Sequence, residues 1–168
     1  PWRHTLTLFG SYAESVPDLP QSFRQIGRSS QASARYTVPL SEIWGITHQL
    51  QAGFDWKRTN NNLEFGGVSV LNNAADVAQW TAAYSASRPD AWGTTALNAG
   101  VFFSPGGFND KNTSAALQTQ RAGVEARYAY ARIGVDRLTP LPEAFSWVVR
   151  VQGQLASGPL MPSEQLGF

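Results

Sequence analysis

The sequence predicts an all-β fold, an antiparallel transmembrane β-barrel segment, and three observations lead to this expectation. Apolar and polar residues alternate over segments of about ten residues, the length that a tilted strand needs to cross a bilayer. The connections between these segments are alternately short and long. Only 15% of the 168 residues are charged and 12% are aromatic, while the mean hydropathy is slightly polar at −0.26. No run approaches the roughly 18 consecutive apolar residues of a membrane-spanning helix.

The first three predicted strands are the segments 2–12, 31–38 and 49–57. In the third, Leu50 and Phe54 stand on an apolar face and Gln51 and Asp55 on a polar one, because successive side chains of a strand point to opposite faces. The second segment divides in the same way. In the first, one face is more apolar than the other, but the two faces are less cleanly divided than in the second and third segments.

Four further strands are predicted at 77–87, at 94–103, in a long segment that ends near Leu138, and at 145–156. This gives about seven strands in all. The alternation of the sixth would place Glu125 and Arg127 on its apolar face. We interpret this break as a β-bulge or as a strand that reaches above the membrane.

The connections carry a second pattern. Short turns are expected at 39–43, 88–91 and 140–144, and long loops at 14–25, 59–75 and 105–120. Outer-membrane barrels have short periplasmic turns and long extracellular loops. Each short turn ends with an acidic residue and a small or aliphatic residue, and an aromatic residue follows directly. We therefore predict an interfacial aromatic girdle that comprises Trp44, Trp92 and Phe145 at the periplasmic side and Trp56, Tyr84 and Phe103 towards other strand ends.

The polar faces supply the candidate functional residues. The residues expected to line a lumen are Arg3, Gln31, Arg35, Gln49, Gln51, Asp55, Lys57, Gln79, Asn98, Arg132, Asp136, Arg150, Gln152 and Gln154. Individually these side chains solvate a wet interior and form salt bridges. Collectively they would give a moving polypeptide a hydrated wall. Arg132 and Asp136 could instead anchor a re-entrant loop.

Other chemistry is not indicated by the sequence. There is no Cys, and the two His residues, His4 and His48, fall on apolar faces without a partner at ligand spacing. Phosphate-loop, dinucleotide and nucleophile-elbow motifs are missing. No basic cluster follows a nucleic acid. We expect no catalytic residue, no metal, no small-molecule cofactor and no nucleic-acid partner. The alternatives are a soluble antiparallel barrel or sandwich, and an outer-membrane hydrolase.

The tail of the sequence adds a resemblance. Gly153-Gln154 leads into Leu160-Met161-Pro162-Ser163-Glu164-Gln165-Leu166. This stretch resembles the two-partner secretion outer-membrane transporters, which export and activate haemolysins and filamentous haemagglutinins. In that family a strand with Gly-Gln runs into Leu-x-Pro-Ser-Glu-Gln-Phe and then into a large loop that folds back into the pore. Leu166 stands where the family more often has an aromatic residue. Segments 27–40, 48–57 and 137–142 also resemble strands of this barrel, but only 152–165 is specific.

The resemblance implies a function for the chain. It would be a central portion, over residues 1–168, of a barrel of about sixteen strands, and the family's periplasmic polypeptide-transport-associated domains would lie outside it. The pore would secrete a large partner exoprotein across the bacterial outer membrane without ATP, with the lipid bilayer and the exoprotein as its partners. A passive diffusion porin and a barrel-assembly protein of the same superfamily are the alternatives. Phe168 could also be a terminal assembly signal, but Pro159 and Pro162 count against a terminal strand.

Overall fold

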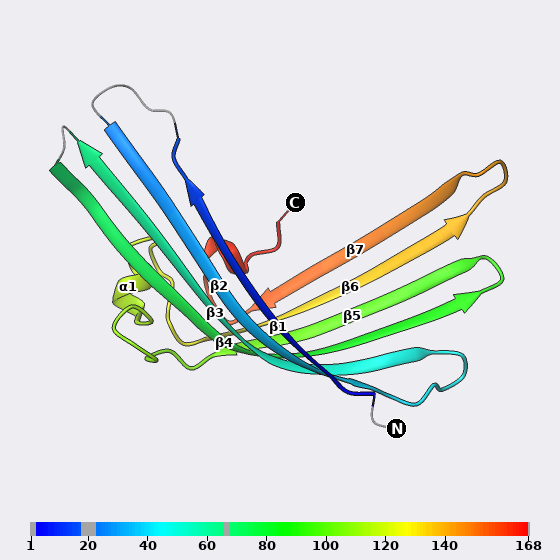
Figure 1. Ribbon diagram of the computed structural model, residues 1–168. Helices are drawn as coiled ribbons and strands as arrows, with labels where there is room; N and C mark the ends of the chain where they lie inside the picture. Colours follow the sequence, from blue (N-terminus) through cyan, green and yellow to red (C-terminus); the bar gives the residue numbers. More distant parts are fainter. Residues whose placement is uncertain (1–2, 18–22, 66–67, 168) are drawn as a thin grey trace.

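The computed structural model describes residues 3–17, 23–65 and 68–167. Within these ranges, seven strands form one antiparallel sheet in which each strand pairs with the next along the chain (Figure 1). The strands are β1 (Thr5–Ser15), β2 (Phe23–Pro39), β3 (Thr47–Phe65), β4 (Val68–Asp90), β5 (Gly93–Ser104), β6 (Tyr128–Pro140) and β7 (Ser146–Ala156). The prediction of an all-β fold with seven antiparallel strands is confirmed, in the form of an open sheet.

The register of the sheet brings the alternating faces of the strands into line. One cross-strand row runs through all seven strands and consists of Leu6, Tyr36, Ala52, Ala82, Val101, Ala131 and Leu155. Since a slip by one residue would turn a strand over, such a row requires every pair of strands to keep its phase. The sheet therefore has one continuous apolar face and one continuous polar face.

The predicted long loop at 59–75 is wrong. β3 continues to Phe65 and β4 begins at Val68, with Thr59 opposite Ala75 and Asn60 opposite Ala74. The register shifts once, between Leu63 and Glu64. A segment rich in Asn is a loop signal on its own, but here the described residues other than Val70 have cross-strand partners, and pairing overrides a weak local preference.

The other two long connections differ from the prediction in extent. β1 continues to Ser15 and β2 begins at Phe23, so the first connection is shorter than 14–25, and its residues 18–22 lie outside the described residues. The connection that starts at Pro105 is confirmed as long and continues to Arg127. It contains the short helix α1 (Ser114–Gln118), which the sequence did not indicate.

The sixth strand needs no bulge to explain its phase. β6 begins at Tyr128, so Glu125 and Arg127 precede the strand and belong to the long connection. From Tyr128 onwards the alternation is regular, and Ala129 and Ala131 lie on the apolar face opposite Phe103 and Val101. The expectation of a bulge, or of a strand that reaches above the membrane with Glu125 and Arg127 in it, was wrong.

A small core forms where the long connection and the tail meet the sheet. Leu117 and Val124 of the connection pack with Leu160 and Met161 of the tail against the sheet side chains Ala75, Val77, Tyr128 and Tyr130. Val77 and Tyr130 belong to the polar face by register, so both inserted segments lie on that side. Figure 1 shows the tail, in red, inside the bend of the sheet. Among the described helices none has the length and apolar character to cross a membrane.

Candidate functional site: the polar face and its covering tail

The residues predicted to line a lumen share one face wherever they lie in strands. The row through Gln49, Ser85, Asn98, Gly134 and Gln152 shows this, because each of these residues is opposite the next. Arg3 precedes β1 and is exposed. The register thus gathers side chains from distant parts of the chain onto one polar surface.

Most charged side chains on this face are paired with one another. An Arg35 guanidinium nitrogen lies 2.6 Å from Asp55 Oδ1, and Lys57 Nζ lies 2.5 Å from Glu164 Oε1. Arg150 pairs with Asp136 on the neighbouring strand. In each of these pairs a cation faces a carboxylate, so the surface carries few uncompensated charges.

Glu164 is the centre of the site, although the sequence did not single it out as a functional residue. Its side chain is only 1% exposed. Its carboxylate accepts hydrogen bonds from Lys57 Nζ at 2.5 Å, Gln79 Nε2 at 2.8 Å, the Tyr130 hydroxyl at 2.7 Å and Ser163 Oγ at 3.0 Å. Three strands, β3, β4 and β6, therefore hold one carboxylate of the tail.

The backbone of the tail is held at the same place. The carbonyl oxygen of Glu164 accepts from the Arg132 guanidinium at 2.6 Å and from Gln154 Nε2 at 2.7 Å. Gln154 Oε1 in turn accepts from the backbone N–H of Leu166 at 2.7 Å. Of the two candidate anchors Arg132 and Asp136, only Arg132 contacts the tail, and Asp136 binds Arg150 instead.

Electrostatics favour the ionised form of Glu164. Burial by itself raises the pKa of this carboxyl. The charge of Lys57 and the hydrogen bonds from Lys57, Tyr130 and Gln79 together outweigh that effect and hold the pKa below its usual range. The tail is thus anchored by a charged group that stays ionised at neutral pH.

An aromatic cluster supports the anchor. The rings of Phe102 and Tyr130 stack with their centroids 4.4 Å apart, and the Arg132 guanidinium lies 5.0 Å from the Tyr130 centroid. The Tyr128 hydroxyl donates to Gln79 Oε1 at 2.9 Å. Sequence reasoning missed both tyrosines. The phase of Ala129 and Ala131 would have placed them on the polar face, but not against the tail.

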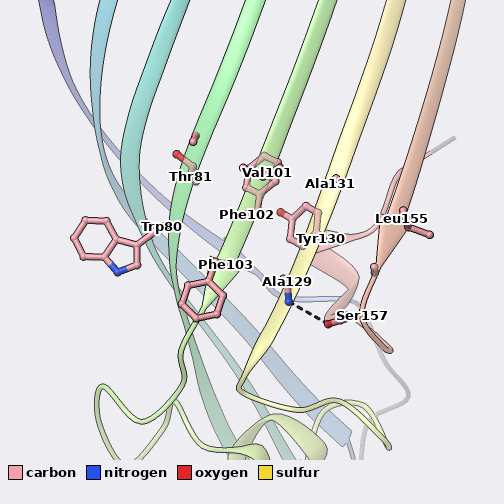
Figure 2. A pocket seen from close by; sticks show the side chains of 12 residues that line it. Trp80, Thr81, Val101, Phe102, Phe103, Ala129, Tyr130, Ala131, Leu155 and Ser157 are labelled. Atoms are coloured by element: carbon pink, nitrogen blue, oxygen red, sulfur yellow. Dashed lines mark hydrogen bonds between the residues drawn. The ribbon is translucent and has the colours of Figure 1, made fainter.

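The opposite face of the sheet is apolar. A shallow hollow between β4 and β7 is lined by Trp80, Val101, Phe103, Ala131 and Leu155, and Figure 2 shows these residues on neighbouring strands. Among the described residues, no charged side chain lines it. The ring of Phe54 packs edge-on against Trp80, at a centroid distance of 4.9 Å.

Two ion pairs mark the ends of the apolar face. At one end Arg58 binds Asp76 through two hydrogen bonds of 2.7 Å each. At the other end, Arg137 binds Asp90 at 2.5 and 2.9 Å. Both arginines belong to this face by register, since Arg58 follows Trp56 in phase and Arg137 follows Val135. The apolar face is thus a band with polar borders.

The aromatic residues predicted as a girdle fall into two groups. Trp44, Trp92 and Phe145 lie at the short turns and are 87%, 77% and 68% exposed. Trp56 and Phe103 lie towards the long connections. Tyr84 does not lie with them; it is nearer the short turns, where its hydroxyl lies 3.1 Å from His48 Nδ1.

The two histidines have similar surroundings. His4 Nδ1 lies 2.5 Å from the Tyr36 hydroxyl, and His48 has the corresponding contact to Tyr84. His48 Nε2 also lies 2.8 Å from the carbonyl oxygen of Ser41. In the part of the chain that the structure describes, no three His, Asp or Glu side chains gather as a metal site.

Comparisons of the chain with protein-family models, with curated proteins and with solved structures found no match.

Proposed function

We propose that this chain forms part of the wall of a pore-forming outer-membrane transporter, which secretes a large partner exoprotein of the haemolysin or adhesin type without ATP. The observation that carries the proposal is the division of one sheet into an apolar band with charged borders and a polar face with paired charges. A barrel wall between lipid and water needs this division.

The height of the apolar band supports a bilayer as its surroundings. On β4 the uncharged part of this face ends at Asp76 on one side and, two residues before the border residue Asp90, at Arg88 on the other; these two charged residues are twelve positions apart. At about 3.3 Å per residue this distance is roughly 40 Å along the strand. A strand tilted by about 45° would span roughly 28 Å of membrane, close to the ~25–30 Å of a hydrocarbon core. The band therefore has the height that a membrane-facing wall requires.

The polar face suits the passage of an unfolded polypeptide. Amides such as those of Gln31, Gln51 and Gln152 offer weak hydrogen bonds that water can replace. The paired charges, for example Arg35 with Asp55, leave few sites that would retain a passing segment. Since the outer membrane has no ATP, direction would come from folding of the cargo outside. The resemblance of 152–165 to secretion transporters favours this cargo over small solutes.

Deletion of the complete gene tests the proposal. A large exoprotein should then remain in the periplasm, and a plasmid-borne wild-type copy should restore its secretion. The measurement is the amount of exoprotein in the medium and in the periplasm, by immunoblot. Unchanged secretion would contradict the proposal, and a loss of small-solute uptake in its place would indicate a passive porin.

A further inference from the structure

The part of β4 that lies beyond β5 has a free edge. β4 pairs with β3 from Val68 to Ser87, but with β5 only from Trp80 to Asp90. Twelve residues, 68–79, therefore extend past the end of β5 (Figure 1). A strand edge presents backbone N–H and C=O groups that another extended chain can pair with.

The long connection covers one point of this edge. The backbone N–H of Asp76 donates to the carbonyl oxygen of Lys111 at 3.0 Å, and Asn112 Nδ2 donates to the carbonyl oxygen of Asp76 at 2.8 Å. Backbone groups of alternate residues point to the same side of an antiparallel strand. Ala74 therefore directs its N–H and C=O to the same edge, where the described residues provide them with no hydrogen bond.

The edge on the Val68 side of Asp76 also lacks the residues that usually protect an edge strand from pairing. Natural edge strands carry Lys, other charges or Pro that prevent pairing with a further chain. The sequence from Val68 to Ala75 contains none of these residues and includes Val68, Val70 and Leu71. It therefore carries none of the residues that would prevent pairing with an extended chain beside it.

The position of the edge identifies its occupant. It lies beyond the Arg58–Asp76 border of the apolar band, on the side of the long connections, which is the extracellular side in the proposed function. A polypeptide that leaves the pore there is extended and has unpaired backbone groups. The hydrogen bond from Asp76 to the carbonyl oxygen of Lys111, in a turn of the connection, shows that the outward backbone groups of this edge accept a partner from another segment.

We infer that the edge Val68–Ala74 of β4 binds an extended segment of the exported polypeptide by strand addition, an inference that rests on the proposed function. Backbone pairing gives affinity without requiring a particular side-chain sequence. The edge thus receives the first emerging segment and holds it in a β conformation while more chain follows.

One substitution removes an edge donor. Ala74→Pro in the full-length transporter deletes the outward N–H, and Pro is tolerated on the edge of a sheet. Ala74→Val is the matched control, because it keeps the N–H and raises the strand preference. We expect Ala74→Pro to slow the appearance of exoprotein in the medium by about three- to tenfold, the effect of one hydrogen bond. Ala74→Val should secrete at the wild-type rate, with equal amounts of both variants in the outer membrane.

Cross-linking provides a measurement that does not depend on the Pro variant folding. The chain contains no Cys, so Ala74→Cys introduces a single thiol. Against a series of single cysteines in a stalled exoprotein, disulfides should form at every second position, because alternate side chains of an added strand lie on one face.

Failure of the two ideas gives different results. If the wild-type gene restores secretion but cross-links are absent or show no alternation, strand addition at this edge is wrong and the proposed function stands. The same holds if Ala74→Pro reaches the membrane and secretes as fast as Ala74→Val. If the wild-type gene does not restore secretion, the proposed function fails and this inference fails with it.

Discussion

The sharpest test of the membrane assignment compares two adjacent alanines of β4. Ala82 lies on the apolar face, midway between the borders Asp76 and Arg88, and Ala83 lies on the polar face. We predict that Ala82→Arg prevents assembly of the barrel, whereas Ala83→Arg assembles. Both variants introduce the same side chain at neighbouring positions of one strand, so strand preference and net charge are matched.

The expected magnitude follows from the depth of the residue. Arginine on the lipid face of a barrel costs about 2–4 kcal/mol at the bilayer midplane and about 0–1 kcal/mol near the interfaces. Ala82 is about six residues from either border, roughly 20 Å along the strand and about 14 Å in depth at a 45° tilt. In the proposed pore it therefore lies near the midplane, and the equilibrium constant for folding should fall by a factor of about 30 to 900.

The assay is the fraction of full-length protein that resists added protease in outer-membrane preparations, together with its shift in mobility on unheated gels. Arg88→Ala gives a further control, because this residue is at the border, where a charge is not needed for folding. Equal assembly of Ala82→Arg and Ala83→Arg would refute the claim that the two faces meet lipid and water. Loss of Ala83→Arg alone would show that the faces are reversed.

Three further results are expected. Lys57→Met leaves the buried Glu164 carboxylate without its cation, and loss of one partner of a buried pair costs about 3–5 kcal/mol. The tail should then open more often, so that maleimide reacts at least about a hundredfold faster with a cysteine placed at Gln165. An unchanged reaction rate would show that the Lys57–Glu164 pair does not anchor the tail. Folding lowers the pKa of Glu164. The stability that the ionised carboxylate gives the tail is therefore complete above the ordinary glutamate pKa and is lost as the pH falls through the folded value. Hydrogen exchange of the tail, corrected for intrinsic rates, should increase only over that acidic range. Gly93→Ala, at a φ of 149° and facing the backbone of the next strand, should lower the urea midpoint of the folded protein, whereas Gly158→Ala, with open space beside it, should not.

The faces of the sheet could be predicted because they depend on a local rule. Alternation of apolar and polar residues assigns each side chain to a face, and cross-strand pairing then has to bring like faces together. Asn98 and Gln152, for instance, are far apart in sequence, yet their parity places them on one face, and the register then puts them in one row with Gly134 between them. No information about distant contacts was needed for this part of the structure.

The contacts of the tail could not be predicted in this way. Glu164 follows a Pro-Ser pair outside any strand, so no alternation assigns it to a face. Its burial depends on Lys57, Gln79 and Tyr130, which lie up to 107 positions away. The prediction of a loop at 59–75 was wrong for a related reason. These residues form strands because β3 pairs with β4, and not because of their own preferences.

In the proposed function, the two ends of β4 combine a membrane wall with a contact surface in one strand. Between Trp80 and Ser87, strands on both sides pair with its backbone, as a lipid environment would require, because an unpaired N–H or C=O there would cost several kcal/mol. Above Asp76 this requirement ends, since water can hydrogen bond to a free edge. The border ion pair Arg58–Asp76 therefore lies where the need for full pairing stops, and the clamp from Lys111 and Asn112 closes the edge at that level. The Asp76 carboxylate also accepts from Asn109 Nδ2 of the connection at 2.9 Å and from Arg58. Asp76→Asn removes the charge of this carboxylate, so it should loosen the connection 105–127 and make it accessible to protease while the sheet stays folded. Cleavage that requires unfolding of the whole sheet would show that the connection and the sheet are one cooperative unit.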